Sequence, residues 1–168
     1  TVCMSNLYVS DNLSPVVDFD LDPICCVMEG AIYSVRMLIA GSDQPCDFIP
    51  CPVAVDTCAS VSLIREADLP PGVIVAKLEH VPLIRDAQKS LLKILGSCVL
   101  HVSVGDVATT HDFLVVPSLP VPALVGVNFI SKHVTAILPP QRLMVFGNTT
   151  VTMLDSLSQV ETDKYLFT

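Results

Sequence analysis

The chain has 168 residues, a formal net charge of -8 and a hydrophobic fraction of 51%. This length predicts one domain with a sizeable core, and the charged fraction of 15% excludes a disordered composition. Phosphate binding needs a surplus of Lys and Arg, so the acidic balance argues against nucleic acid as a ligand. The mean hydropathy of +0.62 is high. It predicts either that much apolar surface is exposed or that a partner covers part of it, and a second copy of the chain is the simplest such partner.

The cysteine pattern argues against a metal site. There are seven cysteines, an odd number, and none of them forms a C-x-x-C pair or lies at ligand spacing from a histidine. No signal peptide opens the chain, so we expect reduced thiols, an intracellular and cytoplasmic location, and no cofactor. Because the first residue is Thr, we also expect that the chain is a piece of a longer polypeptide.

The first half of the chain predicts an arm followed by short strands. Residues 1–30 show weak periodicity and are expected to form an N-terminal arm or lead-in. Apolar residues alternate at 33–39, which predicts a half-buried strand. A second strand is expected at 48–55, with its first half at an edge or bulge because of its prolines. Residues 64–72 predict a short helical turn that two prolines end, and residues 73–84 are rich in β-formers.

The second half of the chain continues the β pattern. The polar residues 85–90 separate two apolar runs and predict a hairpin tip, followed by strands within 91–106 and 111–119. The uncharged stretch 113–131 is almost long enough to span a membrane, but its prolines and Gly126 would interrupt a helix. We therefore expect no membrane contact there, but a strand, a proline turn and a short buried helix after Gly126. Terminal strands are expected around the turns "PPQ" and "GN", and the whole pattern predicts an all-β barrel or sandwich.

One motif carries chemistry. In "VAVDTCASVSLI" (53–64), an apolar run delivers Asp56 into a turn of small residues. The stretch "DTCAS" resembles the D-[TS]-G-A-[ST] motif of retropepsin-type aspartic proteases, which occur in retroviruses and in LTR retrotransposons such as the gypsy group. A second stretch, "LVGVNFI" (124–130), is similar to the apolar run, glycine and short helix that follow the flap hairpin in that family. The two motifs and the strands between them cover 31–147, which we take as the domain; 148–168 would be a C-terminal strand or tail.

The resemblance implies a fold, a mechanism and a partner. The fold would be a retropepsin-like barrel with one or two short helices. Two carboxylates facing each other share a proton, one activating water and the other polarising the peptide carbonyl. Because one chain supplies only Asp56, the resemblance implies a two-fold homodimer that cleaves extended apolar peptides or a polyprotein.

The resemblance also implies roles for further residues. Thr57 would form a hydrogen bond across the dimer, and Ala59 and Ser60 would line the substrate backbone. Leu124, Val125, Gly126 and Asn128 would support the aspartate loop from behind. The flap that closes over the peptide would comprise Arg85, Asp86, Ala87, Gln88, Lys89 and Ser90.

Cys58 occupies the position of the motif glycine and leaves two readings open. A side chain there could narrow the substrate site or disturb the turn, because glycine allows close approach and unusual φ values. The first reading is an active endopeptidase, and the alternative is an inactive domain that serves as a homodimerisation or protein-binding module. Cys58 itself is a poor candidate nucleophile, because Asp56 raises its pKa and no histidine lies nearby in sequence. Other readings are an unrelated β-barrel binding domain, with Asp56 as a turn cap, and core or surface roles for the histidines.

Overall fold

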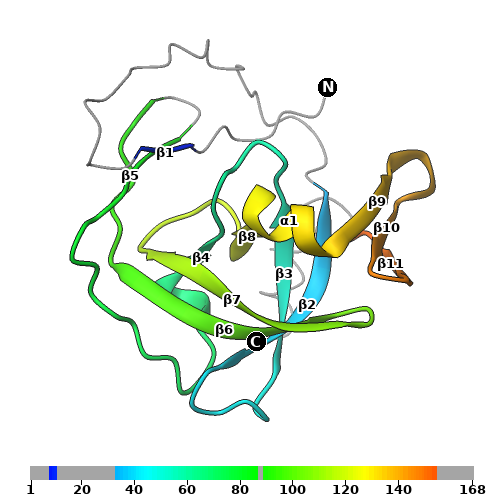
Figure 1. Cartoon of the computed structure of the whole chain (residues 1–168), viewed down its shortest axis with the longest axis horizontal. Coiled ribbons are helices and arrows are strands. Elements are labelled where there is room, and N and C mark those ends of the chain that lie inside the picture. Colours follow the sequence, from blue (N-terminus) through cyan, green and yellow to red (C-terminus); the bar gives the residue numbers. More distant parts are fainter. Residues whose placement is uncertain (1–7, 11–32, 87–88, 155–168) are drawn as a thin grey trace.

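Six strands close into a barrel (Figure 1). The computed structural model describes residues 8–10, 33–86 and 89–154. In order around the barrel the strands are β2 (Ser34–Gly41), β3 (Ile49–Val55), β8 (Ala123–Val125), β4 (Leu63–Arg65), β7 (Val107–Val116) and β6 (Gly96–Val104). The predicted all-β class is confirmed. In the described part of the chain, no helix is long and apolar enough to cross a membrane.

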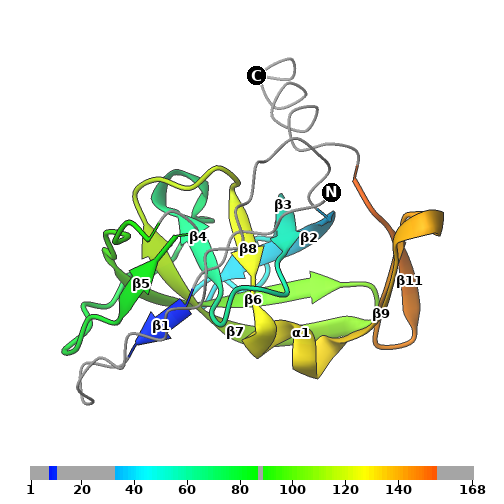
Figure 2. The ribbon, with the colours of Figure 1, turned by 90° about the horizontal axis from the view of Figure 1, so that it is seen from above.

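Smaller elements flank the barrel. The helix α1 (Val127–His133) follows β8 and leads into a three-stranded sheet of β9 (Val134–Leu138), β10 (Leu143–Phe146) and β11 (Thr149–Thr152). Figure 2 shows this sheet at one end of the barrel, and the β1 (Tyr8–Ser10) and β5 (Leu83–Arg85) pair at the opposite end. The two short 3-10 helices are η1 (Glu66–Asp68) and η2 (Pro139–Gln141). Most of the predicted arm 1–30 lies outside the described residues, and β11 lies in the segment 148–168.

The alternation of the barrel strands places apolar side chains in the interior. In β6, Leu100, Val102 and Val104 are buried, as their spacing of two predicts. The main core cluster joins the barrel strands to α1 and the second sheet, and its largest members are Phe113, Phe129 and Phe146. A second cluster, here called the loop-side cluster, lies around the segment after β3. It contains Ala54, Ala59, Leu63, Ile84, Val116, Leu119, Val121 and Leu124.

The prolines of β3 mark an edge, as expected. Pro50 and Pro52 lie in the half of β3 that pairs only with β2, whereas the second half, Val53 to Val55, also pairs with β8. An edge position leaves no neighbouring strand on the side where the missing N–H would be needed. The strand therefore becomes a fully paired central strand just before it reaches Asp56.

The β-rich reading of residues 73–84 is wrong for most of that segment. Only Ala76 bridges to Ser97, and regular pairing begins at Leu83. Ile74 is 63% exposed, which shows that its side chain does not pack against a sheet. β-propensity largely reflects packing against neighbours on a sheet, and this segment follows a turn at Gly72 without a full partner strand.

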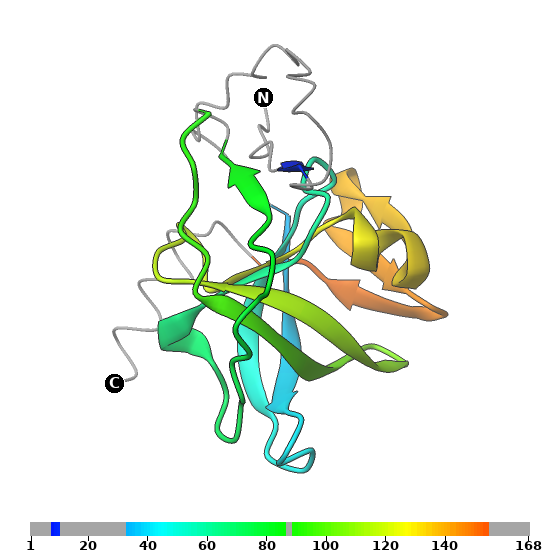
Figure 3. The same ribbon diagram turned by 60° about the vertical axis from the view of Figure 1, so that its left-hand side comes forward.

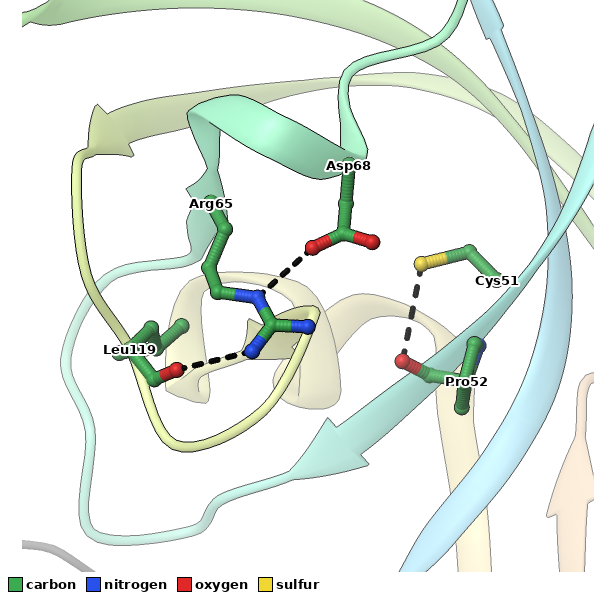
Figure 4. Close-up of polar contacts among 5 residues, drawn as sticks. All are labelled: Cys51, Pro52, Arg65, Asp68 and Leu119. Carbon is green, nitrogen blue, oxygen red and sulfur yellow. Dashed lines mark hydrogen bonds and ion pairs between the residues drawn. The ribbon is translucent and has the colours of Figure 1, made fainter. Parts of the chain in front are cut away.

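A charged side chain fixes the turn that follows β4. Arg65 donates from Nε to Asp68 Oδ2 at 2.7 Å and from Nη1 to the carbonyl of Leu119 at 3.2 Å (Figure 4). The same figure shows the Cys51 thiol turned to the Pro52 carbonyl on β3. Arg65 thus ties η1 to the proline-rich loop between β7 and β8, which precedes the second of the two sequence motifs.

Replacement of a core residue tests this assignment of inner and outer faces. Leu100→Ala should lower the free energy of unfolding by about 2–5 kcal/mol, because it leaves a cavity in a fully buried position of β6. Val99→Ala, on the neighbouring position of the same strand with Val99 42% exposed, is the matched control and should change it by less than about 0.5 kcal/mol. Urea denaturation measures both. Equal losses would contradict the assignment.

Candidate active site

Asp56 lies where two parallel strands end side by side. Val55, the last residue of β3, pairs with Val125, the last residue of β8, and β8 pairs on its other side with β4. The Asp56 N–H donates to the Val125 carbonyl at 3.0 Å, which extends the ladder by one residue. The residue is only 3% exposed. The barrel therefore holds a carboxylate at one end with its backbone fixed by two strands.

The loop after Asp56 folds back on the carboxylate. Cys58 donates its N–H to Asp56 Oδ1 at 2.9 Å, and the Ala59 N–H donates to the Asp56 carbonyl at 3.2 Å. Ala59 is fully buried in the loop-side cluster, and its carbonyl accepts the Val127 N–H at 2.7 Å. These bonds satisfy the turn locally and orient one oxygen of the carboxylate. Thr57 and Ser60, by contrast, are exposed.

Cys58 fits this turn without a strained backbone. Among the described residues, the only non-glycine residues with positive φ are Lys89 and Arg142, so Cys58 does not occupy a conformation reserved for glycine. Its side chain is half-buried. Burial and the neighbouring Asp56 carboxylate raise the pKa of the Cys58 thiol, against a hydrogen bond with Thr57 that lowers it. The thiol therefore stays protonated at neutral pH, which agrees with its dismissal as a nucleophile.

Gly126 supports the loop because it has no side chain. A Cβ at this position would lie 2.5 Å from the Val61 carbonyl oxygen and 2.6 Å from that of Ala59. The φ of -98° is ordinary, so space and not conformation requires glycine here. The predicted supporting residues Leu124, Val125 and Gly126 thus all lie against the Asp56 loop or in the cluster beneath it.

A buried hydroxyl connects this loop to α1 and β7. The Ser62 hydroxyl donates to Asn128 Oδ1 at 2.9 Å, accepts the Gly126 N–H at 3.2 Å and lies 2.9 Å from His111 Nε2. Because a hydroxyl has one proton, His111 must donate from Nε2 to the Ser62 oxygen. Asn128 was predicted as a supporting residue from its motif. Ser62 was not identified, and His111 was expected only in a core or surface role.

The His111 ring lies in an apolar setting. It is 8% exposed and meets the rings of Phe113 and Phe129 edge to face. Burial lowers the pKa of His111 most; Lys132 and His133 lower it further, while Asp112 and Asn128 act in the opposite direction. The burial of His111 could have been predicted from the sequence. His111 shares the spacing of two with Phe113 and Val115 and so belongs to the inner face of β7.

The predicted flap residues form a hairpin whose base reaches the loop-side cluster. Asp86 and Ser90 close the turn through the Asp86 N–H to the Ser90 carbonyl at 3.0 Å, and Lys89 has the positive φ of 63° that such a turn requires. Arg85 donates to the Lys89 carbonyl at 3.0 Å, while Ala87 and Gln88 lie outside the described residues. Ile84 is fully buried in the same cluster as Ala59. The hairpin is thereby anchored beside the Asp56 loop.

Comparisons with known proteins identify the fold. No family model matches the chain, and no curated protein matches its sequence. Among solved structures it is similar to the retroviral protease-like domain of Ddi1 from Leishmania major, with a TM-score of 0.54 and 16% identity over 76% of this chain and 99% of that domain. A protein of unknown function from Legionella pneumophila matches at a TM-score of 0.35 and 15% identity, over 61% of this chain and 87% of that one. The first match confirms that the chain has a retropepsin-like fold.

Enlarging Gly126 tests the support of the loop. Gly126→Ala should lower the free energy of unfolding by about 3 kcal/mol, because the new methyl group meets two backbone carbonyls that cannot rotate away. Lys132→Ala, at an exposed position of the helix that follows Gly126, should change it by less than about 0.5 kcal/mol. Thermal or urea unfolding distinguishes the two. A tolerated alanine at 126 would refute the close approach.

Titration of His111 predicts a stability that falls in acid. Its pKa is lower in the folded chain than its ordinary 6.5, so below pH 6.5 the unfolded chain binds more protons and stability declines. The loss is at most about 1.4 kcal/mol per pH unit for a single proton. His111→Gln removes the titration and should flatten the curve between about pH 7 and pH 5. Urea unfolding at several pH values measures the free energy of unfolding of the unsubstituted chain and of His111→Gln. The contributions of the other titrating groups cancel in the difference between the two chains. Parallel curves of stability against pH would contradict the prediction.

Proposed function

We propose that this chain is an aspartic endopeptidase of the retropepsin type, which acts as a homodimer. Each chain contributes Asp56, one carboxylate activates water, and the other, protonated, polarises the scissile carbonyl. The substrate is an extended, apolar peptide or polyprotein segment. The observation that carries the proposal is the placement of Asp56. Its backbone is fixed by β3 and β8, and its carboxylate is oriented by the Cys58 N–H within a retropepsin-like barrel.

The surroundings of Asp56 support a second chain at this end of the barrel. Thr57 is exposed immediately beside the buried carboxylate, and Val127, whose N–H is bonded to the loop, exposes 45% of its surface. One chain offers one carboxylate of this kind, and the proposed chemistry needs two within hydrogen-bonding distance. A two-fold axis beside Thr57 would bring the two Asp56 side chains together and cover the apolar surface around Val127.

The position of Cys58 favours a second candidate, a binding module without catalysis. Its half-buried side chain replaces a hydrogen atom beside the carboxylate, where a bound peptide would have to approach closely. The ordinary backbone at Cys58 supports the active enzyme instead, because the turn keeps its shape with a side chain present. The two candidates differ in whether the thiol leaves room for the peptide.

Cleavage assays distinguish these candidates. The unsubstituted chain, incubated with a library of extended apolar peptides at mildly acid pH, should cleave at defined bonds, and Asp56→Asn should lower the rate at least about 100-fold. Asp43→Asn, which makes the same chemical change in an exposed turn, should leave the rate unchanged. Mass spectrometry of the products measures all three chains.

Cys58→Gly completes the test. A similar rate in Cys58→Gly and the unsubstituted chain supports the enzyme as it stands. Activity that arises only with the glycine supports the binding module, since the thiol would then be what blocks the peptide. If neither chain cleaves any peptide, the endopeptidase proposal is wrong.

A further inference from the structure

The strand β5 has two edges, and they have different partners. One edge closes the hairpin, where the Leu92 N–H donates to the Ile84 carbonyl at 2.8 Å and the Asp86 N–H to that of Ser90. Main-chain groups of successive residues in a strand point to opposite edges. Leu83 and Arg85 therefore direct their N–H and carbonyl groups to the other edge, which is the edge that binds an extended segment by strand addition.

This second edge is occupied by the chain itself. The strand β1 pairs with it antiparallel, with Tyr8 opposite Arg85, Val9 opposite Ile84 and Ser10 opposite Leu83. β1 is three residues long and belongs neither to the barrel nor to the second sheet. An isolated pair of this size is marginally stable in water, so β1 is a displaceable occupant.

The occupied edge lies next to the Asp56 loop. Ile84 and Ala59 belong to the same loop-side cluster, so β5 and the loop after Asp56 lie against a shared core. Figures 2 and 3 show β1, in dark blue, between β5 and the loop that joins β3 to β4. A chain that lies on this edge of β5 is therefore an extended segment held between the hairpin and the residues that follow Asp56.

We propose that β1 is a built-in peptide mimic, which occupies the edge where the site holds an extended peptide and thereby limits access to it. This inference rests on the proposed function for the identity of the site. The sequence of β1, "YVS" at 8–10, begins with two residues that favour extended strands, as the proposed substrate requires. Because β1 is tethered, its local concentration reaches the millimolar range, and a free peptide of equal intrinsic affinity competes poorly.

Peptide binding to a chain with a weakened β1 tests the proposal. Ser10 faces Leu83, so Ser10→Pro removes a ladder N–H from β1, whereas Ser10→Ala keeps it and is the matched control. Both changes are made in the full chain that also carries Asp56→Asn, so that cleavage cannot remove the probe. The probe is a fluorescent peptide with the sequence of residues 6–12, and anisotropy measures its dissociation constant.

We expect Ser10→Pro to bind the probe at least about tenfold more tightly than Ser10→Ala or the chain with native Ser10. Equal affinities, or no binding by Ser10→Pro, would overturn the proposal. Hydrogen exchange of the chain with native Ser10 gives a second criterion. The amides of Leu83 and Arg85 should exchange more slowly in that chain than in Ser10→Pro, because native β1 covers them for a larger fraction of the time, and equal exchange in the two chains would also overturn the proposal.

The binding assay does not depend on catalysis, so the two proposals can fail separately. Tight binding by Ser10→Pro without cleavage by any chain would reject the endopeptidase and retain the mimic. Cleavage by the unsubstituted chain with equal probe affinities would reject the mimic and retain the endopeptidase.

Discussion

The structure depends on holding one carboxylate at the end of a barrel. Asp56 is 3% exposed, and a buried carboxylate is costly unless hydrogen bonds orient and stabilise it. The Cys58 N–H, which donates to the carboxylate, meets part of this requirement. The ladder bond from the Asp56 N–H to the Val125 carbonyl fixes the backbone that carries the carboxylate. This ladder bond needs β3 and β8 to end at the same level, as the parallel pairing of the two sequence motifs provides. The Ser62 hydroxyl then joins the loop, α1 and β7 through its hydrogen bonds with Gly126, Asn128 and His111.

The same constraint explains why Cys58 is tolerated structurally. The turn is fixed by backbone bonds from Cys58 and Ala59 and by the space that Gly126 leaves, and none of these needs a glycine at position 58. The position that requires glycine is instead Gly126, where the carbonyls of Val61 and Ala59 approach the backbone closely. Cys58 changes only the outer surface of the turn. This is the side on which we propose that a peptide binds and that β1 lies when no peptide is bound.

The proline turn and the short helix after Gly126 were predicted correctly, since prolines interrupt a continuous helix. The helix was expected to be buried, but only its Phe129 is. Most of the segment 73–84 was predicted wrongly, because its composition favours strands but no strand lies alongside it before Leu83. Ser62 with His111 and β1 with β5 join residues 49 and about 75 positions apart, and short-range patterns contain no information on such contacts.

The central claim is that two Asp56 loops complete one active site, and mixed dimers test it most directly. Unsubstituted chain and Asp56→Asn are mixed in equal amounts at a fixed total concentration, allowed to exchange subunits, and assayed for cleavage of a single apolar peptide. If each active site needs both carboxylates, only dimers of two unsubstituted chains cleave, and the rate is about one quarter of that of the unsubstituted protein. A rate of about one half would mean that each chain acts with its own Asp56, and would contradict the account.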